Sequence, residues 1–341
     1  MIGIRFFSFA FVCMVAALSL PSPAMAIEYK IIDRIKVPDG GFDYAAFDVA
    51  KGRVLMARTD YTTVINTKTG QVSQLTSAAH GHMAIPVPGT TLLVLPQGAG
   101  TVRIADAATD TVVADIPGGT GPDGAVYDPF TKFVFVMNHG GGDATVIDPV
   151  TKKSVATIPV GGTLEFPTSD GAGKVFVNVT SVPEIAVIDV KTRAVTARYE
   201  LTGCKGASGL AYDRQAMLLI SSCGNGMAKV LRADTGKEIA SLPIANGPDA
   251  VLFDPSRKLA FIPCGRDGIL EVISLADPEH ISVIQHVSTQ VGSRTGTIDT
   301  RTGRIYLMAS LPDPAATPPP GGRGVPRLAG SYEVLVVGPN E

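Results

Sequence analysis

Acidic and imidazole side chains recur along this chain at a nearly constant spacing. The segment GPDGAVYDP at 121–129 returns almost unchanged as GPDAVLFDP at 247–255, and five further segments align with these two. At the aligned position, consecutive copies are separated by 39, 41, 42, 43, 41 and 45 residues. The residues at that position are Asp43, His82, Asp123, Glu165, Ser208, Asp249 and Arg294. A fold that gathers equivalent positions therefore concentrates four carboxylates in one place.

Four neighbouring carboxylates repel one another, so they require a cation, bound protons or hydrogen bonds. Carboxylate oxygens suit Ca²⁺ or Mg²⁺, and a nearby imidazole admits Zn²⁺ or another transition metal. The sequence predicts a divalent-cation site formed by Asp123, Glu165 and Asp249. A catalytic version of this site would use His82 or His139 to move a proton, and Glu165 is the third candidate catalytic residue.

An alternative gives the repeated aspartates a structural role. Asp43, Asp123 and Asp249 lie where the chain turns into a strand, and an aspartate there can accept hydrogen bonds from backbone N–H groups as an Asx-turn. Because the same residue recurs in otherwise unlike copies, this interpretation is favoured for these three residues taken singly. Residues that break the repeat, such as His82 and Glu165, are stronger indicators of function.

The repeated unit predicts four short strands. In the third copy, the segments GAVYD, FVFVMN, ATVID and SVATIPV are separated by turns or by a Gly-rich loop. A single sheet of this kind cannot bury both of its apolar faces, so neighbouring sheets must stack, and seven sheets in a closed ring leave no exposed edge. The sequence therefore predicts an all-β, seven-bladed β-propeller of four-stranded antiparallel blades.

The two ends of the chain indicate how the ring closes. Residues 27–38 precede the first full unit and read as an outermost strand, whereas the last unit ends one strand short at 331–339. We expect the propeller to occupy residues 27–341, with the first segment completing the last blade. The Pro/Gly-rich segment 311–330 interrupts that blade. It is either a lid or docking loop, with Arg323 and Arg327 as polar contacts, or disordered decoration.

In a propeller, the innermost strands line a central channel, and their first residues lie at one mouth. The loops after the second strand of each blade open on the same face and add Asn138 and His139. The predicted ligand-binding residues are Asp43, His82, Asp123, Asn138, His139, Glu165, Ser208, Asp249 and Arg294. His80 and His82 are spaced as H-x-H and could share a metal ion, although solvated-loop or core roles are favoured for this pair.

Several units resemble a known repeat family. The segments FVFVMN, ATVIDPVTKKSVATIPVG and AKVLRADTGKEIASLPIANGPDAVLFDP resemble the YVTN-type β-propeller repeat, and the ending TQVGSRTGTIDTRTGRIYLMAS resembles its YncE-like exported branch. The resemblance covers essentially all of residues 27–339. It implies a propeller that serves as a binding platform, a lactonase or a lyase, or in parts of the family a single-stranded nucleic-acid binder.

The first 26 residues resemble a cleaved secretory signal. They contain one arginine, an apolar run at 6–20 and an Ala-Met-Ala site at 24–26. A retained membrane anchor is the alternative, but the run is shorter than the roughly 20 residues that a membrane span needs. We therefore expect a mature chain that begins near Ile27, has no membrane span, and is periplasmic or secreted.

Export would place Cys204, Cys223 and Cys264 in an oxidising compartment. Cys204 precedes the innermost strand of the fifth blade and Cys223 follows its second strand, so both lie in loops on the mouth side. A Cys204–Cys223 disulfide is the first choice, and the YncE-like branch is similar in carrying such a pair. Cys264 ends the second strand of the sixth blade and is a possible competitor for Cys223, although a buried structural thiol is favoured.

Composition and missing motifs narrow the function. A net charge of −2, no Trp and 6% aromatic residues disfavour nucleic acid as a partner. The sequence contains no CxxCH haem motif, GxSxG elbow or Walker A loop. The leading prediction is a non-enzymatic, exported, monomeric propeller whose mouth binds a small ligand, a metal or a periplasmic protein. The alternative is a divalent-metal-dependent, lactonase-like hydrolase or lyase, and the third is single-stranded nucleic-acid binding.

Overall fold

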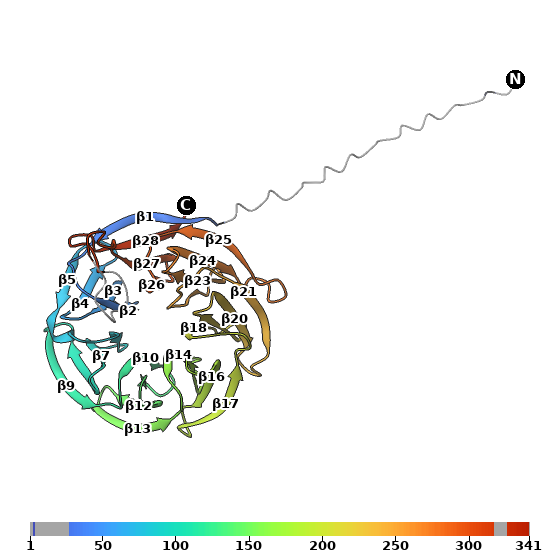
Figure 1. The fold of residues 1–341 in the computed structure, drawn as a ribbon. Helices are drawn as coiled ribbons and strands as arrows, with labels where there is room; N and C mark the ends of the chain where they lie inside the picture. Colours follow the sequence, from blue (N-terminus) through green and yellow to red (C-terminus); the bar gives the residue numbers. More distant parts are fainter. Residues whose placement is uncertain (1–2, 4–26, 317–325, 341) are drawn as a thin grey trace.

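The computed structural model describes residue 3, residues 27–316 and residues 326–340. The predicted signal segment 1–26 lies outside the described residues except for Gly3, as does Arg323 of the Pro/Gly-rich loop. The described chain forms seven four-stranded antiparallel sheets arranged in a ring (Figure 1). The prediction of an all-β, seven-bladed β-propeller is confirmed.

Each blade is a meander that starts at the channel and ends at the rim. The innermost strands are β2 (Phe42–Asp48), β6 (Ile85–Pro86), β10 (Pro122–Asp128), β14 (Leu164–Ser169), β18 (Ala207–Asp213), β22 (Leu252–Asp254) and β26 (Gly296–Asp299), which open blades 1 to 7 in that order. The second strands are β3 (Arg53–Arg58), β7 (Leu92–Gln97), β11 (Phe133–Asn138), β15 (Lys174–Val179), β19 (Leu218–Cys223), β23 (Leu259–Cys264) and β27 (Arg304–Ala309).

The third strands are β4 (Thr62–Asn66), β8 (Thr101–Asp106), β12 (Asp143–Asp148), β16 (Glu184–Asp189), β20 (Met227–Arg232), β24 (Ile269–Ser274) and β28 (Glu333–Pro339). The outermost strands are β5 (Val72–Leu75), β9 (Thr111–Pro117), β13 (Lys153–Pro159), β17 (Ala194–Glu200), β21 (Glu238–Pro243), β25 (Ser282–Ser288) and, in blade 7, β1 (Tyr29–Lys36). A single 3₁₀ turn, η1 (Thr76–Ala78), follows β5.

The first strand of the chain closes the ring, as the sequence predicts. β1 pairs antiparallel with β28, with Tyr29 opposite Pro339 and Lys36 opposite Glu333, and it lies outside β28 in Figure 1. β1 is also tied to blade 6, because the Gln285 side chain bonds both the N–H of Tyr29 at 2.9 Å and its carbonyl at 2.7 Å. The two ends of the propeller therefore hold one blade together.

Within residues 27–316 and 326–340, the apolar core is divided into seven clusters, one between each pair of neighbouring blades. Strands of the second and third positions read as continuous apolar runs, such as FVFVMN in β11, because both of their faces are buried. Burial between blades, at roughly 25 cal/mol per Å² of apolar surface, is the main contribution that stabilises the ring. This packing of blade against blade holds the innermost strands rigidly around the channel.

We call the side where the innermost strands begin the mouth face, and the side where they end the turn face. A buried arginine shapes the approach to the mouth face in blade 1. Arg58 is 2% exposed, and its guanidinium donates hydrogen bonds to the carbonyls of Pro38, Gly40 and Gly41 at 2.7–2.9 Å. These contacts fix the segment that leads into β2, and with it the position of Asp43.

The Pro/Gly-rich loop leaves blade 7 on the mouth face, between β27 and β28. Its base is an isolated bridge between Pro312 and Arg327, and Arg327 donates to the carbonyl of Ser310 at 3.2 Å. The N–H of Gly330 bonds the carboxylate of Asp39. Among the described residues, no helix is long and apolar enough to span a bilayer.

Candidate functional site at the channel mouth

The residues at the aligned position lie at or just before the start of each innermost strand, and in four blades a shift in the pairing register directs their side chains. In β2, β10, β14 and β18 the pairing register shifts directly after the first residue, for example between Pro122 and Ala125. A bulge of this kind leaves its residues outside the ladder and redirects their side chains. In blades 2 and 6 the first residue is held instead by isolated bridges, Gly81 to Gln97 and Pro248 to Cys264.

The first group at the mouth joins Asp43, His82 and Asp123 from three successive blades. His82 Nδ1 lies 2.7 Å from Asp43 Oδ2 and 3.5 Å from Asp123 Oδ1. The opposite edge of the imidazole rests on the next loop, where a Cβ on Gly98 would lie 2.7 Å from His82 Nε2. The glycine therefore admits the ring and keeps Nδ1 turned toward the two carboxylates.

The second group joins Asp123, His139 and Glu165. His139 Nδ1 lies 3.4 Å from Glu165 Oε1 and 3.8 Å from Asp123 Oδ2. The same nitrogen is 2.9 Å from the carbonyl oxygen of Leu164, and since a carbonyl only accepts, Nδ1 carries the proton here. Tyr44 completes the group by donating its hydroxyl to Glu165 Oε2 at 3.1 Å.

Each group offers three potential metal ligands whose donor atoms lie within 4.8 Å of one another. Asp123 belongs to both groups, so five residues form one continuous cluster, which we call the mouth cluster: Asp43, His82, Asp123, His139 and Glu165. Their side chains are half-buried, with Asp123 and Glu165 each 19% exposed. The cluster is therefore shielded by the channel wall yet open to small ions.

Burial and mutual repulsion hold protons on the cluster. Burial in the channel, with the neighbouring Asp43, raises the pKa of Asp123 to about 6. Burial and the charge of Asp123 raise the pKa of Glu165 to about 8. The hydrogen bond to Asp43 raises the pKa of His82. A bound divalent cation would replace these protons as the balancing charge.

Two other predicted ligands form a separate pair. Arg294 Nε donates to Asp249 Oδ2 at 2.8 Å. Burial raises the pKa of Asp249, although Arg294 opposes the shift. Asp249 belongs to neither metal-ligating group found among the described residues. Of the predicted cation set, the structure therefore brings Asp123 and Glu165 together and leaves Asp249 with Arg294.

Asn138 and Ser208 lie near the mouth, but their side chains bond neighbouring segments and not the mouth cluster. Asn138 is fully buried and donates to Asp143 and Thr145 within its own blade. The hydroxyl of Ser208 bonds the carbonyl of Pro248 at 3.2 Å. Neither side chain is part of the mouth cluster.

The Asx-turn interpretation of Asp43, Asp123 and Asp249 is not supported. Within the described residues, the hydrogen bonds of their carboxylates come from the side chains of His82 and Arg294, and none comes from a backbone N–H. The physical reason is the irregular start of each strand, which turns these side chains into the channel and away from the backbone of the turn. The carboxylates of Asp43 and Asp123 therefore face His82 of a neighbouring blade, whereas that of Asp249 is paired with Arg294.

The other histidines lie outside the cluster. His80 is exposed, adopts a left-handed backbone with φ of 59°, and is absent from both metal-ligating groups, so the H-x-H pair does not share a site. It lines a hollow of 270 Å³ that also touches Asp43 and His82. His280 pairs with Asp277 and His286 with Glu271 in the outer part of blade 6.

The cysteines form the disulfide that the sequence analysis favours. Cys204 and Cys223 form a disulfide with their Cα atoms 5.4 Å apart. Cys264 is a free, fully buried thiol whose pKa is raised by burial. The structure thus contains the pair expected from the sequence, and the Cys264 thiol is buried.

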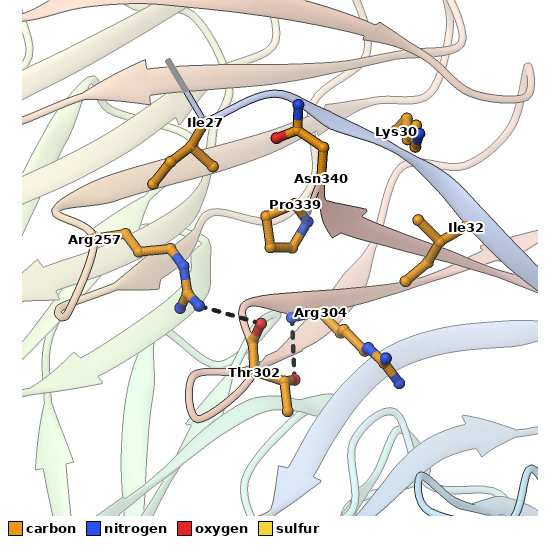
Figure 2. A pocket seen from close by; sticks show the side chains of 8 residues that line it. All are labelled: Ile27, Lys30, Ile32, Arg257, Thr302, Arg304, Pro339 and Asn340. Atoms are coloured by element: carbon orange, nitrogen blue, oxygen red, sulfur yellow. Dashed lines mark hydrogen bonds between the residues drawn. The ribbon is translucent and has the colours of Figure 1, made fainter. Parts of the chain in front are cut away.

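A second hollow lies away from the mouth, where the two ends of the propeller meet (Figure 2). It encloses 790 Å³ and is lined by Ile27, Lys30, Ile32, Arg257, Thr302, Arg304, Pro339 and Asn340. Arg257 donates to the carbonyl of Thr302 and pairs with Asp254 at 2.8 Å. Among the described residues, its lining has three cations and none of the carboxylate, imidazole or thiolate groups that bind metals, so the candidate site remains at the mouth.

Sequence reasoning missed Tyr44. It directly follows the aligned Asp43, and the irregular strand start brings its hydroxyl to Glu165, 121 positions away. Its pKa is raised well above the usual range by burial and by the surrounding carboxylates, so the phenol stays neutral and donates. Inspection of the residues beside each aligned position would have singled it out, because the other copies have no hydroxyl-bearing aromatic there.

Comparisons with known proteins bear on the fold alone. No protein-family model matches the chain, and no curated protein sequence matches it. A chain in a structure titled "Crystal Structure of Mitotic Checkpoint Complex" is similar at a TM-score of 0.74 and 12% identity, over 98% of this chain and 99% of that one. A chain of "Kuenenia stuttgartiensis Hydrazine Synthase" is similar at a TM-score of 0.71 and 13% identity, over 80% and 94%. At these identities the likeness shows the β-propeller fold, which carries many functions.

Proposed function

We propose that this protein is a binding propeller whose mouth cluster holds divalent metal ions. The observation that carries the proposal is the overlap of two carboxylate–imidazole groups at Asp123, each with donor atoms within 4.8 Å of one another. The carboxylates accept no backbone hydrogen bonds among the described residues, and the pKa values of Asp123 and Glu165 are raised by burial and by neighbouring carboxylates. A cation would relieve that repulsion.

The donor set favours a transition metal over the Ca²⁺ or Mg²⁺ that carboxylates alone suggest. Ca²⁺ and Mg²⁺ bind oxygen ligands almost exclusively, whereas imidazole nitrogen suits Zn²⁺ and its neighbours in the first transition row. The mouth cluster places His82 Nδ1 and His139 Nδ1 beside the carboxylates. Each nitrogen must be free of its proton to bind a metal, so His139 Nδ1 has to give up its hydrogen bond to the carbonyl of Leu164. Affinity therefore rises with pH.

Metal analysis of residues 27–341 tests the proposal. The protein is stripped with a chelator, dialysed separately against Zn²⁺, Mn²⁺, Ca²⁺ and Mg²⁺, and its bound metal is measured by elemental analysis. We expect retention of Zn²⁺ and Mn²⁺ and weaker retention of Ca²⁺ and Mg²⁺. Asp123→Ala loses the metal because both groups share that residue.

Asp60→Asn is the matched control, because Asp60 is an exposed carboxylate on the same face that lies outside both groups. It should retain as much metal as the unaltered protein. Absence of bound metal under all four conditions, or undiminished binding by Asp123→Ala, would contradict the proposal.

Export and family membership are part of the same proposal. The segment 1–26 supports secretion by its composition, and the Cys204–Cys223 disulfide is the kind of bond that persists outside the cytoplasm. We place the protein in the periplasm or outside the cell, as a monomer of the YVTN type. The support for this family is the resemblance of the repeats at 27–339. The acidic mouth disfavours nucleic acid there, since phosphates and carboxylates repel.

Metal-assisted hydrolysis or elimination is a second candidate, favoured by one observation. In the metal-free cluster the pKa of Glu165 is raised to about 8, so this carboxyl group is protonated at neutral pH. It keeps that proton, and can act as a general acid, only where the metal is held by Asp43, His82 and Asp123 and Glu165 is not a ligand. His139 contacts the same carboxyl group. Turnover of a lactone panel that falls at least about 100-fold in Glu165→Gln would establish this activity.

A further inference from the structure

The two oxygens of Asp123 face different imidazoles. Oδ1 lies 3.5 Å from His82 Nδ1, and Oδ2 lies 3.8 Å from His139 Nδ1. Each imidazole also has a carboxylate that it does not share, Asp43 at 2.7 Å and Glu165 at 3.4 Å. The cluster thus has two similar halves, each with one imidazole and one carboxylate, joined by a carboxylate that points one oxygen into each half.

We infer that the mouth cluster binds two divalent ions, bridged by the carboxylate of Asp123. The inference rests on the proposed metal-binding function and specifies its stoichiometry. One ion would be held by Asp43, His82 and Asp123 Oδ1. The other would be held by Asp123 Oδ2, His139 and Glu165.

A single ion does not account for the arrangement. Ligand atoms on one Zn²⁺ lie about 2.0–2.2 Å from the metal, so any two of them are at most roughly 4.4 Å apart. Each half of the cluster is close to this limit, with its donor atoms within 4.8 Å. Among the described residues, no single group within that limit contains both imidazoles. One ion in either half therefore leaves the other imidazole and its carboxylate without a metal.

A bridging carboxylate suits the charge balance as well. The five residues supply up to three negative charges, from Asp43, Asp123 and Glu165, and two neutral imidazoles when their protons are released. Two divalent ions bring four positive charges, which leaves the occupied site slightly positive. Three protein ligands for each ion also leave coordination positions for water or for an oxygen of a ligand. The two metal ions of such sites are typically about 3.5–4 Å apart in proteins.

Mn²⁺ is the probe that separates one ion from two. An isolated Mn²⁺ gives a resolved six-line electron paramagnetic resonance spectrum, and two carboxylate-bridged ions give a broadened, exchange-coupled spectrum. The experiment loads residues 27–341 with Mn²⁺, counts bound ions by equilibrium dialysis and records the spectrum. We expect two ions for each chain and the coupled signal.

Variants of single halves sharpen the result. His82→Ala and His139→Ala should each retain one ion, with an uncoupled six-line spectrum, and Asp60→Asn should match the unaltered protein. His82→Gln and His139→Gln provide a second pair that keeps the side-chain volume. Circular dichroism and the melting temperature confirm that every variant is folded before its ions are counted.

The outcomes distinguish the inference from the function on which it rests. No bound Mn²⁺ and no bound Zn²⁺ in the unaltered protein overturns the proposed function. One ion of either metal overturns the two-ion inference and leaves the proposed function standing. Two ions without coupling, or two ions retained in His82→Ala, overturns the bridge. If protons alone balance the charge of the cluster, the unaltered protein will bind neither Mn²⁺ nor Zn²⁺.

Discussion

Aspartates stand at both ends of the innermost strands, and the two ends use them differently. At the turn face, Asp48, Asp128, Asp213, Asp254 and Asp299 are at most 6% exposed. Each accepts a hydrogen bond from a backbone N–H two or three residues later. These residues are the Asx-turns that the repeat requires, and they fix the turn between the first and second strands.

At the mouth face, Asp43 and Asp249 accept hydrogen bonds from side chains of other blades, and Asp123 lies near two imidazoles. The channel changes character between the two faces. A hollow of 670 Å³ is lined by residues of the innermost strands and their turns, among them Phe166, Tyr212 and Phe253 with Asp213 and Arg214, whereas the mouth carries the cluster of carboxylates and imidazoles. Recurrence of a residue in a repeat therefore does not identify its role. What decides the role is whether the backbone or another blade supplies its partners.

The largest expected effect comes from removing an aspartate at each end in turn. Asp128→Ala leaves the N–H and hydroxyl of Thr131 and the hydroxyl of Ser169 without their acceptor, so the free energy of unfolding should fall by about 2–4 kcal/mol. Asp123→Ala removes a carboxylate from a repelling cluster, so the metal-free protein should be unchanged or more stable. Urea unfolding measures both, and equal losses would contradict the comparison.

The pH dependence of stability is the next effect. The pKa of Glu165 is raised to about 8 by burial and by Asp123, from a usual value of 4.5. The folded state therefore holds this proton more tightly than the unfolded chain. Its contribution to stability is complete below about pH 4.5 and is lost as pH rises through 8.

Glu165→Gln removes this titration and keeps an acceptor for the hydroxyl of Tyr44. The melting temperature of the metal-free unaltered protein should therefore fall relative to Glu165→Gln between about pH 5 and pH 8, by about 5 °C. The two curves become parallel at higher pH. Curves that are parallel throughout would show that Glu165 is an ordinary solvated carboxylate.

The smallest effect is expected for the pair outside the cluster. Arg294 is 50% exposed, so its ion pair with Asp249 is screened by solvent. Arg294→Ala should lower the free energy of unfolding by about 1 kcal/mol or less in urea unfolding. A loss as large as that of Asp128→Ala would place this pair among the structural contacts of the ring.

The fold could be predicted from the sequence because it depends on periodic features. Seven aligned segments with short β-branched strands require seven stacked sheets, and the missing strand of the last unit predicts that β1 completes it. In a closed ring equivalent positions converge, and for this reason Asp43, His82, Asp123 and Glu165 could be predicted to meet.

The rest depended on side-chain directions that no repeat fixes. Asn138 turns into its own blade, where Thr145 accepts from its amide. Asp249 is paired with Arg294 from the next blade, which is itself one of the predicted ligands. Tyr44 reaches Glu165 because of an irregular strand start, and such irregularities have no signature in the spacing of the repeat.

Anomalous diffraction from crystals of residues 27–341 soaked with Mn²⁺ or Zn²⁺ tests the central claim most directly. The account predicts anomalous peaks within about 2.0–2.3 Å of Asp123 Oδ1 and Oδ2, each also bound to one of the two imidazoles. Soaked crystals with an accessible mouth that show no peak there, or that show peaks only at other sites on the surface, would contradict it.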